Sequence, residues 1–224
     1  MNNKIVNAIK DTLEIRKKVI EACIFLQKTG YFIGTWGNIS VRVENGFLLT
    51  PSRIDYRKMQ PEDLVLMSWD GTKMKGHRLP SSEMNLHRLI LKKRQNLGAM
   101  IHTHSPYAST VACTRKTIPV ITEEMSQIIG NEVRCTKYIP AGRHMPFAKE
   151  VCQTMGNLSS AVLLSNHGAV VGGRDLSEAV VAAQVLEKVS FIFINSKPIG
   201  GSKIIPDELI KEERDRFLYK YGKE

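Results

Sequence analysis

The sequence predicts an α/β protein with a three-layer α/β/α arrangement around a largely antiparallel central sheet. Two pairs of short strand-like segments are each joined by a tight-turn sequence, which is typical of antiparallel hairpins. Long segments with apolar residues at helical spacing lie before and after these pairs. Helices that cover both faces of such a sheet give three layers. The length of 224 residues favours one domain, residues 1–224, with a sizeable core.

The first half of the chain is predicted to begin with a helix and continue as two hairpins. Residues 4–28 carry apolar side chains at close to helical spacing, and Gly30 follows as a termination signal. Asn-Gly between apolar runs is the strongest short hairpin signal. The predicted hairpins are residues 38–43 with 47–50, joined by Glu44-Asn45-Gly46, and residues 64–67 with 72–75, joined by Trp69-Asp70-Gly71.

The second half is predicted to combine helices with buried strands. A helix over residues 82–94 is begun by serines and ends before the next apolar run. The runs at 98–101 and 161–164 have the length and composition of buried strands. Helical patterns return over residues 175–195 and 206–220, so helices close the chain.

The net charge of +10 suggests an anionic partner, which could be a nucleic acid or a small substrate. The basic residues are scattered, and the densest cluster, Lys92-Lys93-Arg94, lies on one predicted helix face without interleaved aromatic residues. A solvated helix face explains that cluster better than nucleic-acid binding. The same charge would attract a small anionic substrate by long-range steering.

The composition also bears on location. No apolar stretch is long enough to span a bilayer, and the first residues lack the apolar core of a signal peptide, so we expect a cytoplasmic protein without a membrane partner. The four cysteines are widely spaced and form no C-x-x-C motif. We expect free, mostly buried thiols at Cys23, Cys113, Cys135 and Cys152.

Three of the six histidines follow strand-like segments and predict one metal site. His102 and His104 alternate through Thr103 directly after the run 98–101, and side chains two residues apart on a strand share a face. His167 follows the run 161–164. Three imidazoles with an open position are the pattern of catalytic rather than structural zinc. The pair alone would be equally compatible with packed core histidines. The other three, in polar or basic contexts, are expected at the surface or on helix faces: His77, His87 and His144.

Three polar loops could bind an anion. Residues 34–40, Gly-Thr-Trp-Gly-Asn-Ile-Ser, offer backbone N–H groups and small polar side chains. Residues 50–53, Thr-Pro-Ser-Arg, offer hydroxyls and a cation, and residues 80–83, Pro-Ser-Ser-Glu, place hydroxyls at a helix N-terminus. A tight turn, a proline-led loop and an ordinary N-cap explain each loop equally well, and the sequence leaves open whether the three converge.

In their order along the chain, these motifs resemble the class II aldolase/adducin family, most closely its L-fuculose-1-phosphate aldolase branch. The segments are Gly34–Ser40, Thr50-Pro-Ser, Pro80-Ser-Ser-Glu with His87 nearby, His102-Thr-His-Ser and Asn166-His-Gly, so the resemblance covers nearly the whole chain. It implies a three-layer α/β/α domain, a homotetramer with active sites between neighbouring subunits, and a phosphorylated sugar as substrate.

The resemblance also implies roles for individual residues. The zinc ligands fall on His102, His104 and His167, with Glu83 as fourth ligand and general base; Mn²⁺ or Co²⁺ would suit the same donors. An active-site tyrosine falls on Tyr221. The substrate phosphate would meet Thr35, Gly37, Asn38, Ser52, Ser81 and Ser82.

The chain departs from the family pattern at two places. A glycine of the fuculose phosphate aldolases is replaced by Arg53, which either adds a bidentate phosphate contact or points outward. The tyrosine that a neighbouring subunit contributes as proton donor would align within residues 121–125, which hold Glu123 and Glu124 instead. Related methylthioribulose-1-phosphate dehydratases use a glutamate in about this segment, which Glu124 matches better. A solvated helix start explains the acidic pair equally well.

The function predicted from these residues is zinc-dependent cleavage of a ketose 1-phosphate to dihydroxyacetone phosphate and an aldehyde. Zinc would act as a Lewis acid, and Glu83 would move protons at carbon. A dehydratase of the same fold, with Glu124 as base, and a sugar-phosphate 4-epimerase remain alternatives, although an aspartate tends to replace Glu83 in the epimerases. A non-catalytic, adducin-like interaction module is the alternative from another class, and the intact histidines argue against it.

Overall fold

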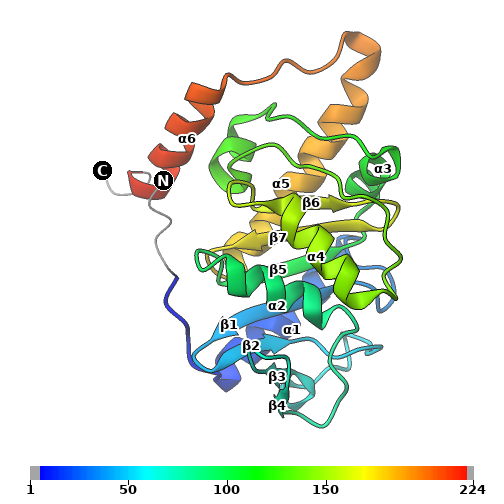
Figure 1. The fold of residues 1–224 in the computed structure, drawn as a ribbon, viewed down its shortest axis with the longest axis vertical. Helices are drawn as coiled ribbons and strands as arrows, with labels where there is room; N and C mark the ends of the chain where they lie inside the picture. The colour runs from blue at the N-terminus through cyan, green and yellow to red at the C-terminus, as the bar shows by residue number, and fades with distance from the viewer. Residues whose placement is uncertain (1–5, 221–224) are drawn as a thin grey trace.

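The computed structural model describes residues 6–220, in which seven strands form one sheet (Figure 1). The strand order is β4-β3-β2-β1-β5-β7-β6, and every neighbouring pair is antiparallel. The predicted antiparallel α/β class is therefore confirmed. The strands are β1 (Asn38–Val43), β2 (Gly46–Leu49), β3 (Val65–Met67), β4 (Lys73–Lys75), β5 (Ala99–Thr103), β6 (Ala161–Leu164) and β7 (Gly168–Gly173).

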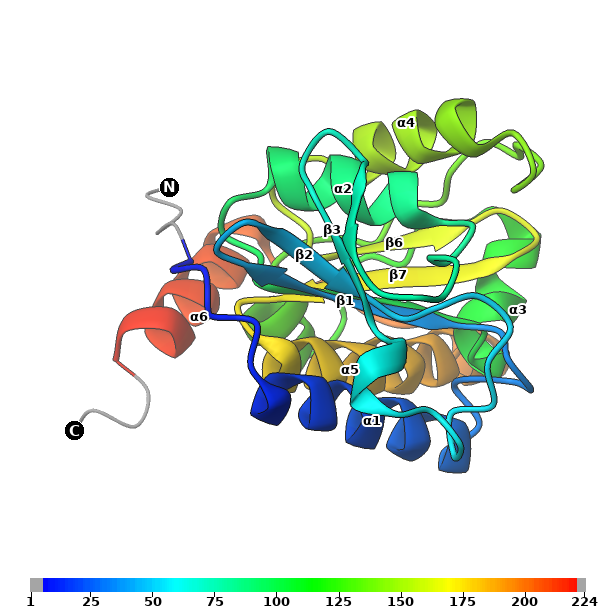
Figure 2. The same cartoon turned by 90° about the horizontal axis from the view of Figure 1, so that it is seen from below.

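Helices cover both faces of the sheet, which confirms the three layers (Figure 2). On one face lie α2 (Met84–Lys93) and α4 (His144–Met155), and on the other α1 (Leu13–Lys28), α3 (Pro106–Thr114) and α5 (Leu176–Asn195). Strand alternation divides the core accordingly: Met100 and Val170 pack toward α2 and α4, whereas Ile101 packs toward α1 and α5. By the same alternation His102 faces α2.

The first helix begins later than predicted, at Leu13 instead of residue 4. The Thr12 hydroxyl accepts a hydrogen bond from Ile15 N at 3.3 Å and caps the helix, with Glu14 in its first turn. Upstream, Ile9 makes a parallel bridge to Val43. The chain around Ile9 therefore pairs with the sheet, although the apolar spacing there resembles that of a helix.

Strand β7 and helices α3 and α4 were not predicted. Close packing requires glycine at two positions of β7. A Cβ added to Gly173 would lie 2.2 Å from Ala179 N of α5, and one added to Gly168 would lie 2.2 Å from Thr103 O. Glycine therefore allows β7 to lie against α5 and beside the end of β5. This places the β6–β7 turn next to His102.

The last helix, α6 (Asp207–Tyr219), is docked on a π-helix, η2 (Met125–Ile129). Arg214 donates to the carbonyls of Gln127 and Ile128, the latter at 2.9 Å, and Gln127 donates to Glu213 at 2.8 Å. The segment that follows Glu124 and the end of the described chain therefore form one packed unit. No helix in the described residues is long and apolar enough to cross a membrane.

The four cysteines are free, as expected. Only Cys23 is fully buried, and burial raises the pKa of its thiol. Cys135 and Cys152 are half-buried and Cys113 is exposed, so the expectation of mostly buried thiols is wrong for Cys113.

Candidate active site

Three histidines meet at the end of β5. His102 lies in β5, His104 follows the strand, and His167 lies in the β6–β7 turn, which Thr103–Ala169 pairing brings alongside. Their ring centroids are 4.6 to 4.9 Å apart, and one nitrogen from each lies within 4.8 Å of the other two. The structure therefore brings together all three histidines that the sequence singled out.

The hydrogen bond of His102 orients its free nitrogen. Its Nδ1 lies 2.9 Å from the carbonyl oxygen of Ala169 and must donate to it, so Nε2 carries the lone pair. That Nε2 is buried and has no hydrogen-bond partner. A buried unpaired acceptor is costly in a folded protein, and a metal ion bound there would satisfy it.

All three rings are neutral near pH 7, as metal ligands must be. Burial lowers the pKa of His102 to about 4. Burial, reinforced by the neighbouring rings, lowers the pKa of His104 to about 3 and that of His167 to about 4.

Glu83 completes the cluster from the opposite side. It precedes α2, and its Oε2 lies 3.3 Å from His102 Nε2 while its Oε1 lies 3.6 Å from His167 Nε2. The carboxylate is buried, with 9% of the residue exposed. Three imidazole nitrogens and one carboxylate form a donor set that suits Zn²⁺, so these residues fit the expected metal.

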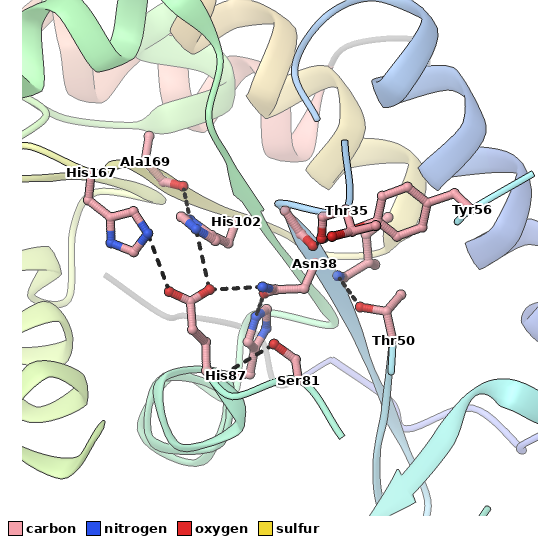
Figure 3. Close-up of polar contacts among 12 residues, drawn as sticks. Thr35, Asn38, Thr50, Tyr56, Ser81, His87, His102, His167 and Ala169 are labelled. Atoms are coloured by element: carbon pink, nitrogen blue, oxygen red, sulfur yellow. Dashed lines mark hydrogen bonds and ion pairs between the residues drawn. The ribbon is translucent and has the colours of Figure 1, made fainter. Parts of the chain in front are cut away.

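His87 was expected at the surface or on a helix face; it lies on a face of α2, but that face is buried and not at the surface. It faces β1, where Ser40 Oγ lies 2.7 Å from its Nδ1. Asn38 Oδ1 contacts its Nε2 (Figure 3). Asn38 in turn donates through Nδ2 to Glu83 Oε2 at 2.8 Å. Burial lowers the pKa of His87 to about 3. His77 and His144 are exposed, as expected.

The three polar loops converge, which the sequence alone left open. Backbone hydrogen bonds join the second and third loops, from Ser52 N to Leu79 O at 3.0 Å and from Ser81 N to Thr50 O at 3.2 Å. The Thr50 hydroxyl accepts from Ile39 N at 3.1 Å and so links the first loop to the second. The candidate phosphate residues differ in exposure: Gly37, Asn38 and Ser81 are buried, Ser52 is half-buried, and Thr35, Arg53 and Ser82 are exposed.

The first loop rests on an aromatic pair that sequence reasoning missed. The ring centroids of Phe32 and Tyr56 are 5.2 Å apart. The Tyr56 hydroxyl contacts the carbonyls of Gly37 at 2.5 Å and Thr35 at 3.2 Å (Figure 3). Gly37 has a φ of +110°, and a Cβ there would lie 2.3 Å from the Phe32 ring. Only glycine therefore lets the loop lie this close to the pair.

Arg53 occupies the left-handed region, with a φ of +56°. This conformation explains why a glycine suits the position, because a side chain at such a φ is strained. The chain keeps an exposed arginine next to Ser52 despite that strain, so the side chain is free to reach a bound anion.

Of the acidic pair, Glu124 lies beside α5. Glu124 precedes η2, which packs against α5, and its Oε1 lies 2.5 Å from Lys188 Nζ. Burial alone would raise the pKa of Glu124, but Lys188 outweighs it and holds the pKa below its ordinary value. The carboxylate is thus ionised on the α5 side of the sheet, opposite α2 and Glu83. Tyr221 lies outside the described residues.

Comparison with known proteins agrees with this site. Residues 17–194 match the family described as the Class II Aldolase and Adducin N-terminal domain, which is most of the chain. The chain belongs to this family. The resemblance read from the motifs is therefore confirmed.

Several relatives are named as sugar-phosphate aldolases. The chain is 33% identical over 191 residues to a 5-deoxy-D-ribulose 1-phosphate aldolase of Bacillus thuringiensis serovar kurstaki, covering 84% of this chain and 88% of that protein. It is 31% identical to a 5-methylthioribulose-1-phosphate/5-deoxyribulose-1-phosphate aldolase of Rhodospirillum rubrum, covering 93% and 91%. The fold is similar to that of an L-fuculose 1-phosphate aldolase structure, with a TM-score of 0.88, 30% identity, and coverage of 93% of this chain and 98% of that one. The chain is thus a class II aldolase, a lyase.

Proposed function

We propose that this aldolase binds Zn²⁺ and cleaves a ketose 1-phosphate to dihydroxyacetone phosphate and an aldehyde. The observation that carries the proposal is the cluster of three neutral histidines and Glu83, in which His102 and Glu83 are buried, His104 and His167 are half-buried, and His102 Nε2 is unpaired. The polar loops joined next to it are suited to hold a phosphate. A non-catalytic interaction module would not need three neutral histidines and a buried carboxylate at one place, since unpaired buried polar groups lower stability.

The proposed metal site consists of His102, His104 and His167, with Glu83 as the fourth ligand when substrate is absent. When bound, Zn²⁺ supplies Lewis-acid stabilisation for the negative charge that develops beside the ketose carbonyl. Mn²⁺ and Co²⁺ accept the same donors, and zinc is the ion we propose because three imidazoles suit it well.

Glu83 is the proposed base at carbon. Cleavage removes a proton from the C4 hydroxyl, breaks the C3–C4 bond so that its electron pair passes to C3, and returns a proton to C3. The reaction is therefore proton-neutral. Released by substrate, the Glu83 side chain would lie next to the reacting carbons. As a carboxylate it removes the C3 proton in the condensation direction. In cleavage it returns a proton to C3 once it has taken up, through solvent, the equivalent of the proton that leaves the C4 hydroxyl.

The phosphate is the proposed handle that positions C3 and C4. We assign the phosphate to the three polar loops, whose hydroxyl, amide and backbone N–H groups are neutral donors. Arg53 adds a cation that can form a bidentate contact with the phosphate. The proposed phosphate-binding residues are Thr35, Gly37, Asn38, Ser52, Arg53, Ser81 and Ser82.

The aldehyde side requires a second subunit in this proposal. Residues 1–224 are taken as one domain of a cytoplasmic homotetramer, with Glu124 reaching the active site of a neighbouring subunit and Tyr221 contributing from the C-terminal segment. An ionised Glu124 has the form needed to accept the C4 hydroxyl proton. The α6–η2 contact supports this assignment, because it holds α6, which precedes Tyr221 in the sequence, against the segment that follows Glu124.

The names of the relatives suggest which substrate to test first. Two of them act on 5-deoxyribulose 1-phosphate, and one of these also acts on 5-methylthioribulose 1-phosphate. Both sugars lack a 5-hydroxyl. We propose 5-deoxypentulose 1-phosphates ahead of fuculose 1-phosphate.

The test is a coupled assay for dihydroxyacetone phosphate with the zinc-loaded protein. The panel contains the 1-phosphates of 5-deoxyribulose, methylthioribulose, ribulose, fuculose and rhamnulose. The proposal predicts release from at least one of them, lost on chelation and restored by zinc. Silence across the panel with zinc bound would contradict aldol cleavage and favour dehydration or epimerisation.

A further inference from the structure

A chain of hydrogen bonds runs behind Glu83 through Asn38, one of the proposed phosphate-binding residues, to His87 and Ser40, which have no role in the proposed reaction. It begins at Ser40, passes through His87 and Asn38, and ends on Glu83 Oε2. Figure 3 shows its part from His87 through Asn38 to Glu83. Two of its members are completely buried, with 0% of Ser40 and 0% of His87 exposed, and Asn38 is 6% exposed. A buried polar chain next to a reactive carboxylate needs an explanation, because apolar side chains would fill the same space at lower cost.

The charge of Glu83 sets the direction of every bond in this chain. A carboxylate only accepts hydrogen bonds, so Asn38 must present its Nδ2 to Glu83 and its Oδ1 to His87. His87 must therefore donate through Nε2, which leaves Nδ1 as an acceptor for the Ser40 hydroxyl. Each group thus has one permitted orientation.

The chain arises from matching spacings on two elements. Glu83 and His87 are four residues apart at the start of α2 and lie on the same helix face. Asn38 and Ser40 are two residues apart on β1 and lie on the same sheet face. The packing of α2 on β1 therefore interlocks the two pairs.

We propose that His87, held by Ser40, is a positioning residue that fixes the Asn38 amide and, through it, aims the Glu83 carboxylate at the metal site. This inference rests on the role proposed above for Glu83. His87 itself does not touch the histidine cluster in the contacts described. Its effect passes through Asn38, so a side chain that restores the single donor to Asn38 restores the function.

The test compares two substitutions of His87 by the zinc affinity of the protein, measured against a chromophoric chelator. His87→Leu keeps the volume and removes the donor, and we expect the Kd for zinc to rise about tenfold, in the range of outer-shell effects. His87→Gln places an amide N–H near the position of Nε2, and we expect a Kd within about threefold of wild type. With an active substrate, kcat falls by about ten- to a hundredfold in His87→Leu while KM stays within about threefold.

Ile90→Ala is the matched control for packing. Ile90 is buried one turn further along α2 and has no part in the chain. We expect this change to lower the melting temperature without changing the zinc Kd. An Ile90→Ala protein that loses as much zinc affinity as His87→Leu would overturn the proposal, as would a His87→Gln protein no better than His87→Leu.

Ser40→Ala keeps the test valid if His87→Leu does not fold. It removes only the first donor, and the proposal predicts a Kd for zinc about threefold higher, whereas an unchanged Kd would contradict it. Because zinc affinity needs no substrate, a silent substrate panel would sink the proposed reaction and leave this result standing. A wild-type protein that binds no zinc would contradict both.

Discussion

At the scale of single residues, Glu83 holds an unusual place. It occupies the N-cap position of α2, yet its side chain makes no capping hydrogen bond. The carboxylate turns instead toward Asn38 and the histidines. The side chain at this helix N-terminus therefore serves the histidine cluster and not the cap of α2.

Glu83→Gln tests the carboxylate with a neutral side chain of the same shape. We expect kcat to fall by about a hundredfold or more, since general acid–base groups contribute about 10²–10⁴-fold. Steady-state kinetics of protein with verified zinc content is the measurement. Full turnover by zinc-loaded Glu83→Gln protein would exclude Glu83 as the base.

Arg53→Gly separates backbone strain from phosphate binding. Removing a side chain at a φ of +56° relieves about 1–3 kcal/mol, partly offset by the greater freedom of glycine in the unfolded chain. We therefore expect equal or higher stability in urea, together with a KM about tenfold higher, because a charge-assisted contact contributes about 1.5–3 kcal/mol.

Arg57→Ala is the control for Arg53→Gly. It removes one positive charge from the same loop, where Arg57 pairs with Asp55. If both variants raised KM equally, general attraction of the anion would explain the effect. An unchanged KM in Arg53→Gly would mean that the side chain points away from the phosphate.

At the scale of elements, the first polar loop depends on the residues beneath it. Tyr56→Phe removes the hydroxyl that contacts the Gly37 and Thr35 carbonyls. We expect a loss of about 1–2 kcal/mol in the free energy of unfolding and a several-fold rise in KM with kcat nearly unchanged. Urea unfolding and steady-state kinetics measure the two effects. A fall in kcat at constant KM would contradict a role confined to the phosphate loop.

Local signals predicted the hairpins well, since Asn45-Gly46 and Asp70-Gly71 specify turns without help from the rest of the chain. These local signals failed where contacts between distant segments determine the structure. Strand β7 has three glycines because α5 and β5 approach it closely, and that approach is invisible in the sequence. The start of α1 was misjudged because Ile9 matches the helical spacing, while the cap at Thr12 is the physical boundary.

In the candidate site, too, local patterns predicted some residues, and packing between elements determined the place of another. Strand alternation and glycine placement were enough to single out His102, His104 and His167, because each follows an apolar run. The burial of His87 was missed because it depends on β1 packing across α2, which the sequence does not show. The four-residue spacing from Glu83 was the available signal, since it places both side chains on one helix face.

At the scale of the whole molecule, buried neutral histidines make the metal-free protein sensitive to acid. The folded pKa is about 3 for His87 and about 4 for His102, below the ordinary value of 6.5. Below pH 6.5 the unfolded chain takes up protons that the folded protein does not, so stability is full above pH 6.5 and is lost as pH falls toward these folded values.

We expect the free energy of unfolding of the chelated protein to fall between pH 7 and pH 5, by at most about 1.4 kcal/mol per pH unit for each such histidine. Urea midpoints at several pH values measure it. His87→Gln should show a shallower slope, and a wild-type midpoint constant from pH 7 to pH 5 would contradict the buried neutral assignment.

The roles proposed for Glu83 and the metal site are tested most directly by proton exchange at the hydroxymethyl carbon of dihydroxyacetone phosphate, which becomes C3 of the ketose. The exchange with deuterated solvent is followed by NMR. It needs no aldehyde, so it tests Glu83 and the metal site without knowledge of the full substrate. We predict that zinc-loaded wild-type protein exchanges one C3 proton stereospecifically, and that chelation or Glu83→Gln abolishes the exchange. Equal exchange by wild-type and Glu83→Gln protein would contradict Glu83 as the base. No exchange by zinc-loaded wild type would contradict the proposed reaction at this site.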